Sequence, residues 1–112
     1  MPNKVKITFV LPMTLQKEFK DKVVQDSHDK KGKSRWVSEA IETLLVTKDF
    51  HDLVKLNDEM KAFEKLESVV VSRDLKKQLD EAIINVRKAY PTIEGVQSRI
   101  VRTAIVQRLL RF

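Results

Sequence analysis

A short run near the N-terminus carries side chains whose types and spacing suit contact with base-pair edges. Lys6, Thr8 and Val10 stand at every second position, so in a β-strand they share one face. A lysine can donate hydrogen bonds to guanine, a threonine hydroxyl can bond a base edge, and a valine can pack on a thymine methyl. The residues between them are apolar and suit a core. The pattern predicts a strand over residues 5–11 with one buried face and one face open to a partner.

An internal repeat supplies a second strand of the same kind. Apolar residues of the first copy recur 60 positions later as the pairs Phe9 and Val69, Leu15 and Leu75, Phe19 and Leu79, and Val23 and Ile83. Ser34-Arg35 recurs as Ser98-Arg99 with a displacement of 64, so the second copy holds four extra residues near Pro91 and Gly95. Each copy therefore predicts a strand, a helix, a turn and a second helix.

The helices that must position these strands show their own apolar patterns. Leu15, Phe19 and Val23 recur every four residues, which predicts one stripe on a first helix that starts at Pro12. Ser34 is expected to cap the next helix. The buried face of that helix is predicted to hold Trp36, Val37, Ala40, Ile41, Leu44 and Leu45. Trp36 is interpreted as a core residue rather than a stacking platform.

The second copy follows the same plan with substitutions. Ser72 takes the place of Pro12 as a helix start, and Ser98 is expected to cap the last helix. Arg108 stands where the first copy has Leu44, so the final turn is expected to be less buried or differently packed. The apolar positions of these helices are Leu75, Leu79, Ile83 and Val86, then Ile100, Val101, Ala104, Ile105 and Leu109.

The segment between the copies, residues 48–66, is predicted to be a helical linker, with the helix running from Asp49 to Leu66. Its apolar seam consists of Leu53, Leu56, Met60 and Phe63. The seam suits either packing on the chain's own core or self-association with another copy.

Composition limits the function classes. The chain has 112 residues, which suits one domain over 1–112, and no cysteine, which excludes disulfides and thiolate metal sites. We find no catalytic or metal-binding motif, no cofactor or small-molecule site, and no membrane span, and we expect a non-enzymatic cytoplasmic protein. The net charge is +6, and the basic residues predominate in two blocks of the sequence that are separated by an acidic segment. This distribution favours a polyanionic partner over a merely solvated surface.

The two copies are expected to act as one unit. A copy of about 45 residues is marginal for an independent core, and its single strand would leave backbone groups unpaired. Residues 5–11 and 67–71 are therefore predicted to form a two-stranded antiparallel ribbon above four interlocked helices. The fold class is α+β, mostly helical.

The motif Pro12-x-x-Leu15-x-x-x-Phe19, followed by a glycine-containing turn and Ser34-Arg35-x-x-Ser38-Glu39-Ala40-Ile41, resembles the ribbon-helix-helix (Arc/MetJ) family of DNA-binding regulators. The match covers residues 4–46 well and 67–110 more loosely. The tandem arrangement, with repeats over 4–47 and 67–112, is similar to pseudodimeric regulators of archaeal viruses. The resemblance implies an intramolecular pseudodimer that regulates transcription, with double-stranded DNA as partner, in a nucleoid or an infected host cell.

The resemblance also implies which residues touch DNA. Base contacts fall on Lys6, Thr8, Val10, Ser68 and Val70. Phosphate contacts fall on Lys4, Lys31, Lys33, Ser34, Arg35, Ser98 and Arg99. Self-association of units on DNA through the linker helix is the second use of its apolar seam that stays open.

Three points stay open at this stage. Glu67 takes the inward position that Ile7 holds in the first copy, so the second strand could slip by one residue. The two half-ribbons differ, so the preferred site need not be a palindrome. The alternative functions are a protein-interaction module of the antitoxin kind and a non-specific DNA-packaging protein.

Overall fold

The computed structural model describes residues 4–27, 32–56 and 64–110. These ranges form an α+β fold that is mostly helical, with one two-stranded antiparallel sheet. The elements follow in the order β1 (Lys4–Pro12), α1 (Met13–Ser27), α2 (Lys33–Leu45), α3 (Phe50–Leu56), β2 (Glu64–Ser72), α4 (Arg73–Ala89) and α5 (Val96–Leu109).

The predicted pairing of the two strands is confirmed. β1 and β2 lie antiparallel along their whole length and extend beyond the predicted residues at both ends. Thr8 lies opposite Ser68, its equivalent in the second copy, so the sheet is centred on corresponding residues of the two copies. The one-residue slip left open by the sequence does not occur, because Glu67 pairs with Phe9 and keeps its inward place.

The two faces of the ribbon differ as the alternation predicts. The inward face contributes Ile7, Phe9, Leu11, Val69 and Val71 to the core, all nearly inaccessible to solvent. The described helices cover this face, and side chains of α2 and α5 also reach the edges of the ribbon. The opposite face leaves its side chains exposed or half-buried.

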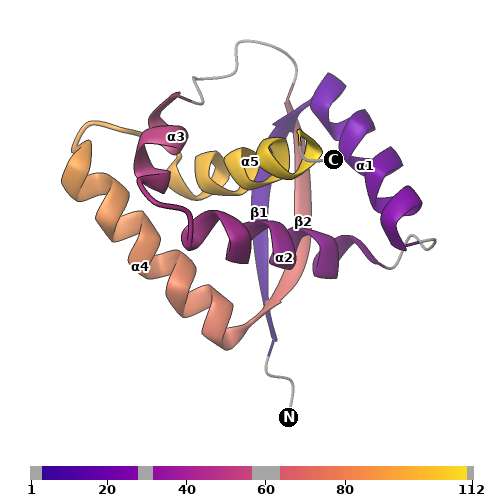
Figure 1. The fold of residues 1–112 in the computed structure, drawn as a ribbon, viewed down its shortest axis with the longest axis horizontal. Coiled ribbons are helices and arrows are strands. Elements are labelled where there is room, and N and C mark those ends of the chain that lie inside the picture. Colours follow the sequence, from indigo (N-terminus) through magenta and orange to yellow (C-terminus); the bar gives the residue numbers. More distant parts are fainter. Residues whose placement is uncertain (1–3, 28–31, 57–63, 111–112) are drawn as a thin grey trace.

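Helices from both copies build one core beneath the ribbon. In Figure 1, α2 and α5 cross the ribbon between α1 on one side and α4 on the other. Leu45 and Leu109 are only partly buried, but the other predicted apolar positions are confirmed for both central helices: Trp36, Val37, Ala40, Ile41 and Leu44 are buried in α2, and Ile100, Val101, Ala104 and Ile105 in α5. All of these buried side chains belong to a single hydrophobic cluster. Within the described ranges, no helix is long and apolar enough to cross a membrane.

The linker prediction was wrong in extent. The helix covers only Phe50–Leu56, and Glu64–Leu66, predicted helical, belong to β2 instead. These residues pair with Val10–Pro12, and the ribbon's hydrogen bonds outweigh the local helical pattern. Val54 rather than Leu56 is buried, and Leu56 is 77% exposed. Met60 and Phe63, which were to complete the seam, lie outside the described residues.

Candidate nucleic-acid interface

The five residues predicted to contact bases lie together on the outward face of the ribbon. Lys6, Thr8 and Val70 are exposed, and Val10 and Ser68 are half-buried. Across the strands, Lys6 faces Val70 and Thr8 faces Ser68. The structure therefore assembles one surface that mixes a cation, two hydroxyls and two branched apolar side chains.

Serine hydroxyls from the second helix of each copy hold the edges of this ribbon. The Val70 N–H donates to Ser34 Oγ at 3.0 Å, and the Val10 N–H donates to Ser98 Oγ at 3.3 Å. The two bonds correspond under the repeat. Each one joins the helix of one copy to the strand of the other.

The expectation that Ser34 and Ser98 cap their helices was wrong. α2 and α5 begin earlier, with Gly32 and Gly95 at the cap positions and no side-chain cap. Both hydroxyls face a strand edge that would otherwise lack partners, so they bond there. A hydroxyl that accepts one bond still has its own hydrogen to donate. Their contact with phosphate therefore stays a prediction. By contrast, the predicted cap at Ser72 is confirmed, since its Oγ accepts from the Leu75 N–H at 3.1 Å.

Gln97 is a ribbon-holding residue that the sequence did not reveal. Its Nε2 donates to the Thr8 carbonyl at 2.8 Å. Gln97 precedes Ser98 just as Lys33 precedes Ser34, and Lys33 also reaches the ribbon. The shared place in the repeat is the signal that would have identified it.

Glu67 is a buried carboxylate held by cations and an amide. It is 6% exposed; its Oε1 lies 3.1 Å from Lys33 Nζ and its Oε2 lies 3.7 Å from Lys20 Nζ. The Gln16 side-chain amide also donates to it. Burial raises the pKa of the Glu67 carboxyl, but the hydrogen bonds and the lysine charges outweigh burial and hold that pKa below 4.5. The carboxylate stays ionised at neutral pH, and its bonds stabilise the observed register.

The cations predicted to contact phosphate are placed unequally. Arg35 lies in the first turn of α2 and its side chain is 87% exposed, with a loose ion pair to Glu39 at 3.8 Å. Lys4 is exposed at the start of β1. Lys33 forms an ion pair with Glu67, so less of its charge is available to DNA. Lys31 lies outside the described residues.

The prediction that Arg99 contacts a phosphate is wrong. It is 8% exposed, and its Nε donates to the Glu94 carbonyl at 3.0 Å. Its equivalent in the first copy, Arg35, is exposed. A guanidinium buried in this way does not reach a phosphate, so we withdraw Arg99 as a contact.

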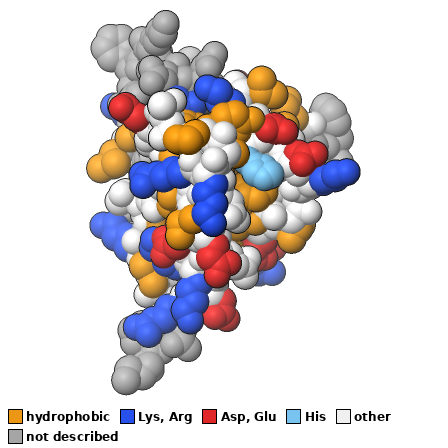
Figure 2. All heavy atoms as spheres, turned by 90° about the vertical axis from the view of Figure 1, so that its left-hand side faces the viewer, with side chains coloured by type: hydrophobic (Ala, Val, Ile, Leu, Met, Phe, Trp, Pro, Cys, Tyr) orange, Lys and Arg blue, Asp and Glu red, His pale blue; other side chains and the backbone are white. Residues whose placement is uncertain are grey.

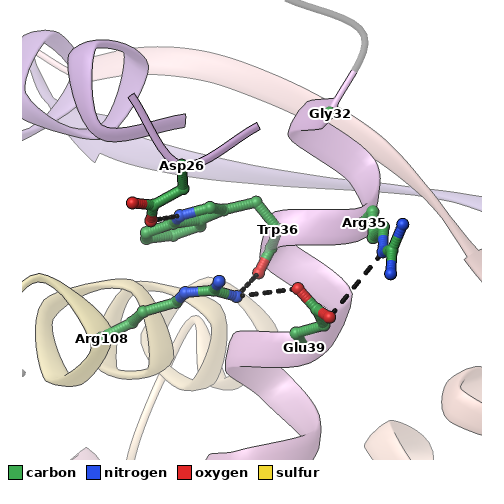
Figure 3. Close-up of a pocket in the computed structure, with 6 residues that line it drawn as sticks. All are labelled: Asp26, Gly32, Arg35, Trp36, Glu39 and Arg108. Carbon is green, nitrogen blue, oxygen red and sulfur yellow. Dashed lines mark hydrogen bonds and ion pairs between the residues drawn. The ribbon is translucent and has the colours of Figure 1, made fainter. Parts of the chain in front are cut away.

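A pocket of about 370 Å³ behind Arg35 joins α1, α2 and α5 (Figure 3). The Trp36 Nε1–H donates to Asp26 Oδ2 at 2.7 Å, and the Arg108 guanidinium lies over the indole ring, 4.5 Å from its centroid. Arg108 also donates to the Trp36 carbonyl at 2.8 Å and to Glu39 at 3.3 Å. Arg35 and Arg108 pair with Glu39, and Asp26 pairs with Lys22 on its own helix, so these contacts form a brace between the three helices.

The structure tests two sequence predictions about residues of this brace, Trp36 and Arg108. Trp36 is confirmed as a core residue, buried and 5.4 Å from the Phe19 ring, centroid to centroid. Arg108 is half-buried, as its place in the repeat predicted, but the sequence did not reveal its stacking on Trp36. The hydrogen bond from Trp36 lowers the pKa of Asp26 against the effect of burial, and the charges of Lys22 and Arg108 lower it further.

The outward face of the ribbon also differs in charge from other faces. Figure 2 shows the side formed by α3 and α4, where basic, acidic and hydrophobic side chains are interspersed. The outward positions of residues 4–10 and 66–72 instead hold two lysines and no carboxylate, while the end pair of the ribbon adds Glu64 opposite Pro12. Among the described residues, no cluster of histidines and carboxylates could hold a metal ion. Of these surfaces, the ribbon is the one that suits a polyanion.

No family model matches the chain, and comparison with curated proteins and with solved structures finds no match either.

Proposed function

We propose that the chain is a sequence-specific double-stranded DNA-binding regulator of transcription of the ribbon-helix-helix type. One observation carries this proposal: an antiparallel two-stranded ribbon whose outward face is uncovered by the described helices and carries Lys6, Thr8 and Ser68. A two-stranded ribbon is narrow enough to enter the major groove, where each base pair displays a distinct pattern of donors and acceptors.

The two copies act as an intramolecular pseudodimer in this proposal. The central pair of Thr8 and Ser68 supports it, because residues related by the repeat lie opposite each other. The exchanged serine bonds support it further, because Ser34 holds the second strand and Ser98 holds the first. A ribbon held at both edges keeps its shape before DNA arrives, which lowers the ordering cost of binding.

Base and phosphate contacts divide between the ribbon and the helix starts. Lys6 donates to guanine O6 or N7, and the hydroxyls of Thr8 and Ser68 bond base edges near the centre of the site. Arg35 lies beside Ser34 at the ribbon's edge and is exposed, so it binds a flanking phosphate. The backbone N–H groups of the first turn of α2 add to this contact.

A mobility-shift titration tests the proposal. A preferred duplex is first selected from a random library, and its affinity is compared with that of random DNA. The double substitution Lys6→Ala with Thr8→Ala removes two base contacts, each worth about 1–3 kcal/mol of discrimination. We expect the preference for the selected duplex to fall at least tenfold.

A second double variant, which also loses one lysine and one threonine, controls for the loss of a charge and of a hydroxyl group. Lys77 lies exposed on α4 and Thr92 lies exposed in the turn that follows, so neither belongs to the ribbon. Lys77→Ala with Thr92→Ala is expected to keep the preference. If the ribbon variant keeps it as well, the ribbon is not the reader and the proposal fails.

A further inference from the structure

The two ends of the ribbon's outward face differ chemically. On one side of the central pair, Lys6 lies opposite Val70; on the other, Val10 lies opposite Leu66. The repeat makes Leu66 the equivalent of Lys6, so one end carries a cation and the other is apolar. Leu66, the third residue of β2, is 71% exposed.

The backbone is fixed in the same way at both ends. The Val70 N–H, at the lysine end, is held by Ser34, and the Val10 N–H, at the apolar end, is held by Ser98. The ends therefore present equivalent main-chain positions to a partner. The two ends differ at the place shared by Lys6 and Leu66, and also at the end pairs of the ribbon, Lys4 with Ser72 and Pro12 with Glu64.

The chemistry of the major groove assigns different bases to the two ends. The lysine ammonium suits the paired acceptors of guanine, O6 and N7. Leu66 and Val10 offer no side-chain hydrogen bond, and the C5 methyl of thymine is the only apolar group that unmodified base pairs show in this groove. The other bases present only donors or acceptors there, so they give these two side chains no matching contact.

We propose that the protein reads a non-palindromic site, with guanine under the Lys6 end of the ribbon and thymine methyl groups under the Val10–Leu66 end. This inference rests on the proposed function. The inference deepens that function by naming the class of DNA that binds, a duplex whose two half-sites differ in base composition.

Base analogues in a selected duplex test the apolar end. The wild-type chain selects a site from random duplexes, and each thymine is then replaced in turn by deoxyuridine, which lacks only the methyl group. A buried methyl contributes about 0.8 kcal/mol, so we expect about fourfold weaker binding at one or two thymines, all within one half-site. Replacing guanine by 7-deazaguanine is expected to weaken binding only in the other half-site.

Two substitutions at one position complete the test. Leu66→Ala is expected to abolish the sensitivity to deoxyuridine while leaving the sensitivity to 7-deazaguanine. Leu66→Lys gives both strands a lysine at the position that Lys6 and Leu66 share, and the selected site is expected to gain a guanine in its second half, which brings it closer to a palindrome. Leu66 is exposed, so both variants are expected to keep the helical circular dichroism of the wild-type chain.

The outcomes separate this inference from the function on which it rests. If the wild-type chain selects no sequence, the proposed function fails and the inference fails with it. If it selects a palindrome, or a site insensitive to deoxyuridine, the DNA-binding function survives and the inference alone is overturned. If Leu66→Ala changes the oligomeric state in light scattering and leaves the response to deoxyuridine unchanged, Leu66 contacts another copy instead, which also overturns it.

Discussion

Replacing Glu67 probes how the ribbon tolerates a charge on its inward face. Glu67 lies opposite Phe9, at the place that Ile7 holds in the first copy, and is 6% exposed. Its carboxylate bonds Lys33 from α2 and Gln16 from α1. Glu67→Ala removes these bonds and leaves space in the core. Glu67→Ile removes the same bonds but restores the apolar side chain of the first copy.

The expected magnitudes differ for the two variants. A hydrogen bond to a charged group contributes about 1.5–3 kcal/mol, but the lysines are partly exposed and return to water, so much of this is recovered. We expect Glu67→Ala to lower the free energy of unfolding by about 2 kcal/mol. Burying an isoleucine contributes about 1.5–3 kcal/mol, which offsets the loss. Glu67→Ile is therefore expected within about 1 kcal/mol of the wild-type chain.

Urea unfolding at several pH values measures both effects. Because the folded state holds the pKa of Glu67 below 4.5, this group stabilises the fold above that pH, and its contribution is lost as pH falls through the folded pKa. Both variants should show a smaller loss of stability between about pH 5 and pH 3 than the wild-type chain. Equal destabilisation by alanine and isoleucine, or an unchanged pH dependence, would refute this reasoning.

Two further predictions concern the helix starts. Arg35→Ala should weaken binding to all sequences alike and reduce the slope of log affinity against log salt by about 1, measured by fluorescence anisotropy, whereas Arg87→Ala on α4 should leave the slope unchanged. Ser34→Ala and Ser98→Ala should each cost about 1 kcal/mol in urea unfolding, and the double variant about the sum, because the bonds lie at opposite edges of the ribbon. A double variant no less stable than the wild-type chain would show that the serines do not hold the ribbon.

Much of the fold could be predicted from the repeat and the strand alternation together. The period of two separated Ile7 and Phe9 from Lys6 and Thr8, and the structure buries the first pair and exposes the second. The 60-residue displacement between the two copies predicts where the second strand lies. Both signals depend on spacing along the chain, which local geometry preserves in the fold.

What the sequence could not supply depends on contacts between distant segments. Glu64–Leu66 carry a helical pattern, but pairing with Val10–Pro12 makes them a strand. Serine is a residue type that often caps helices, so the sequence predicts that role for Ser34. In the fold, the edge of β2 lies close to Ser34, and its hydroxyl accepts a hydrogen bond from that strand instead. Arg99 matches Arg35 in the repeat, yet the longer turn before it supplies the Glu94 carbonyl that holds it in the interior.

The central claim is that the ribbon enters the major groove, and footprinting with dimethyl sulfate tests it most directly. This reagent methylates guanine at N7 in the major groove and adenine at N3 in the minor groove. On the selected duplex, we expect the wild-type chain to protect guanine N7 and leave adenine N3 reactive, and Lys6→Ala to restore reactivity at one guanine. Protection of adenine N3 with guanine N7 left reactive would place the protein in the minor groove and contradict the account.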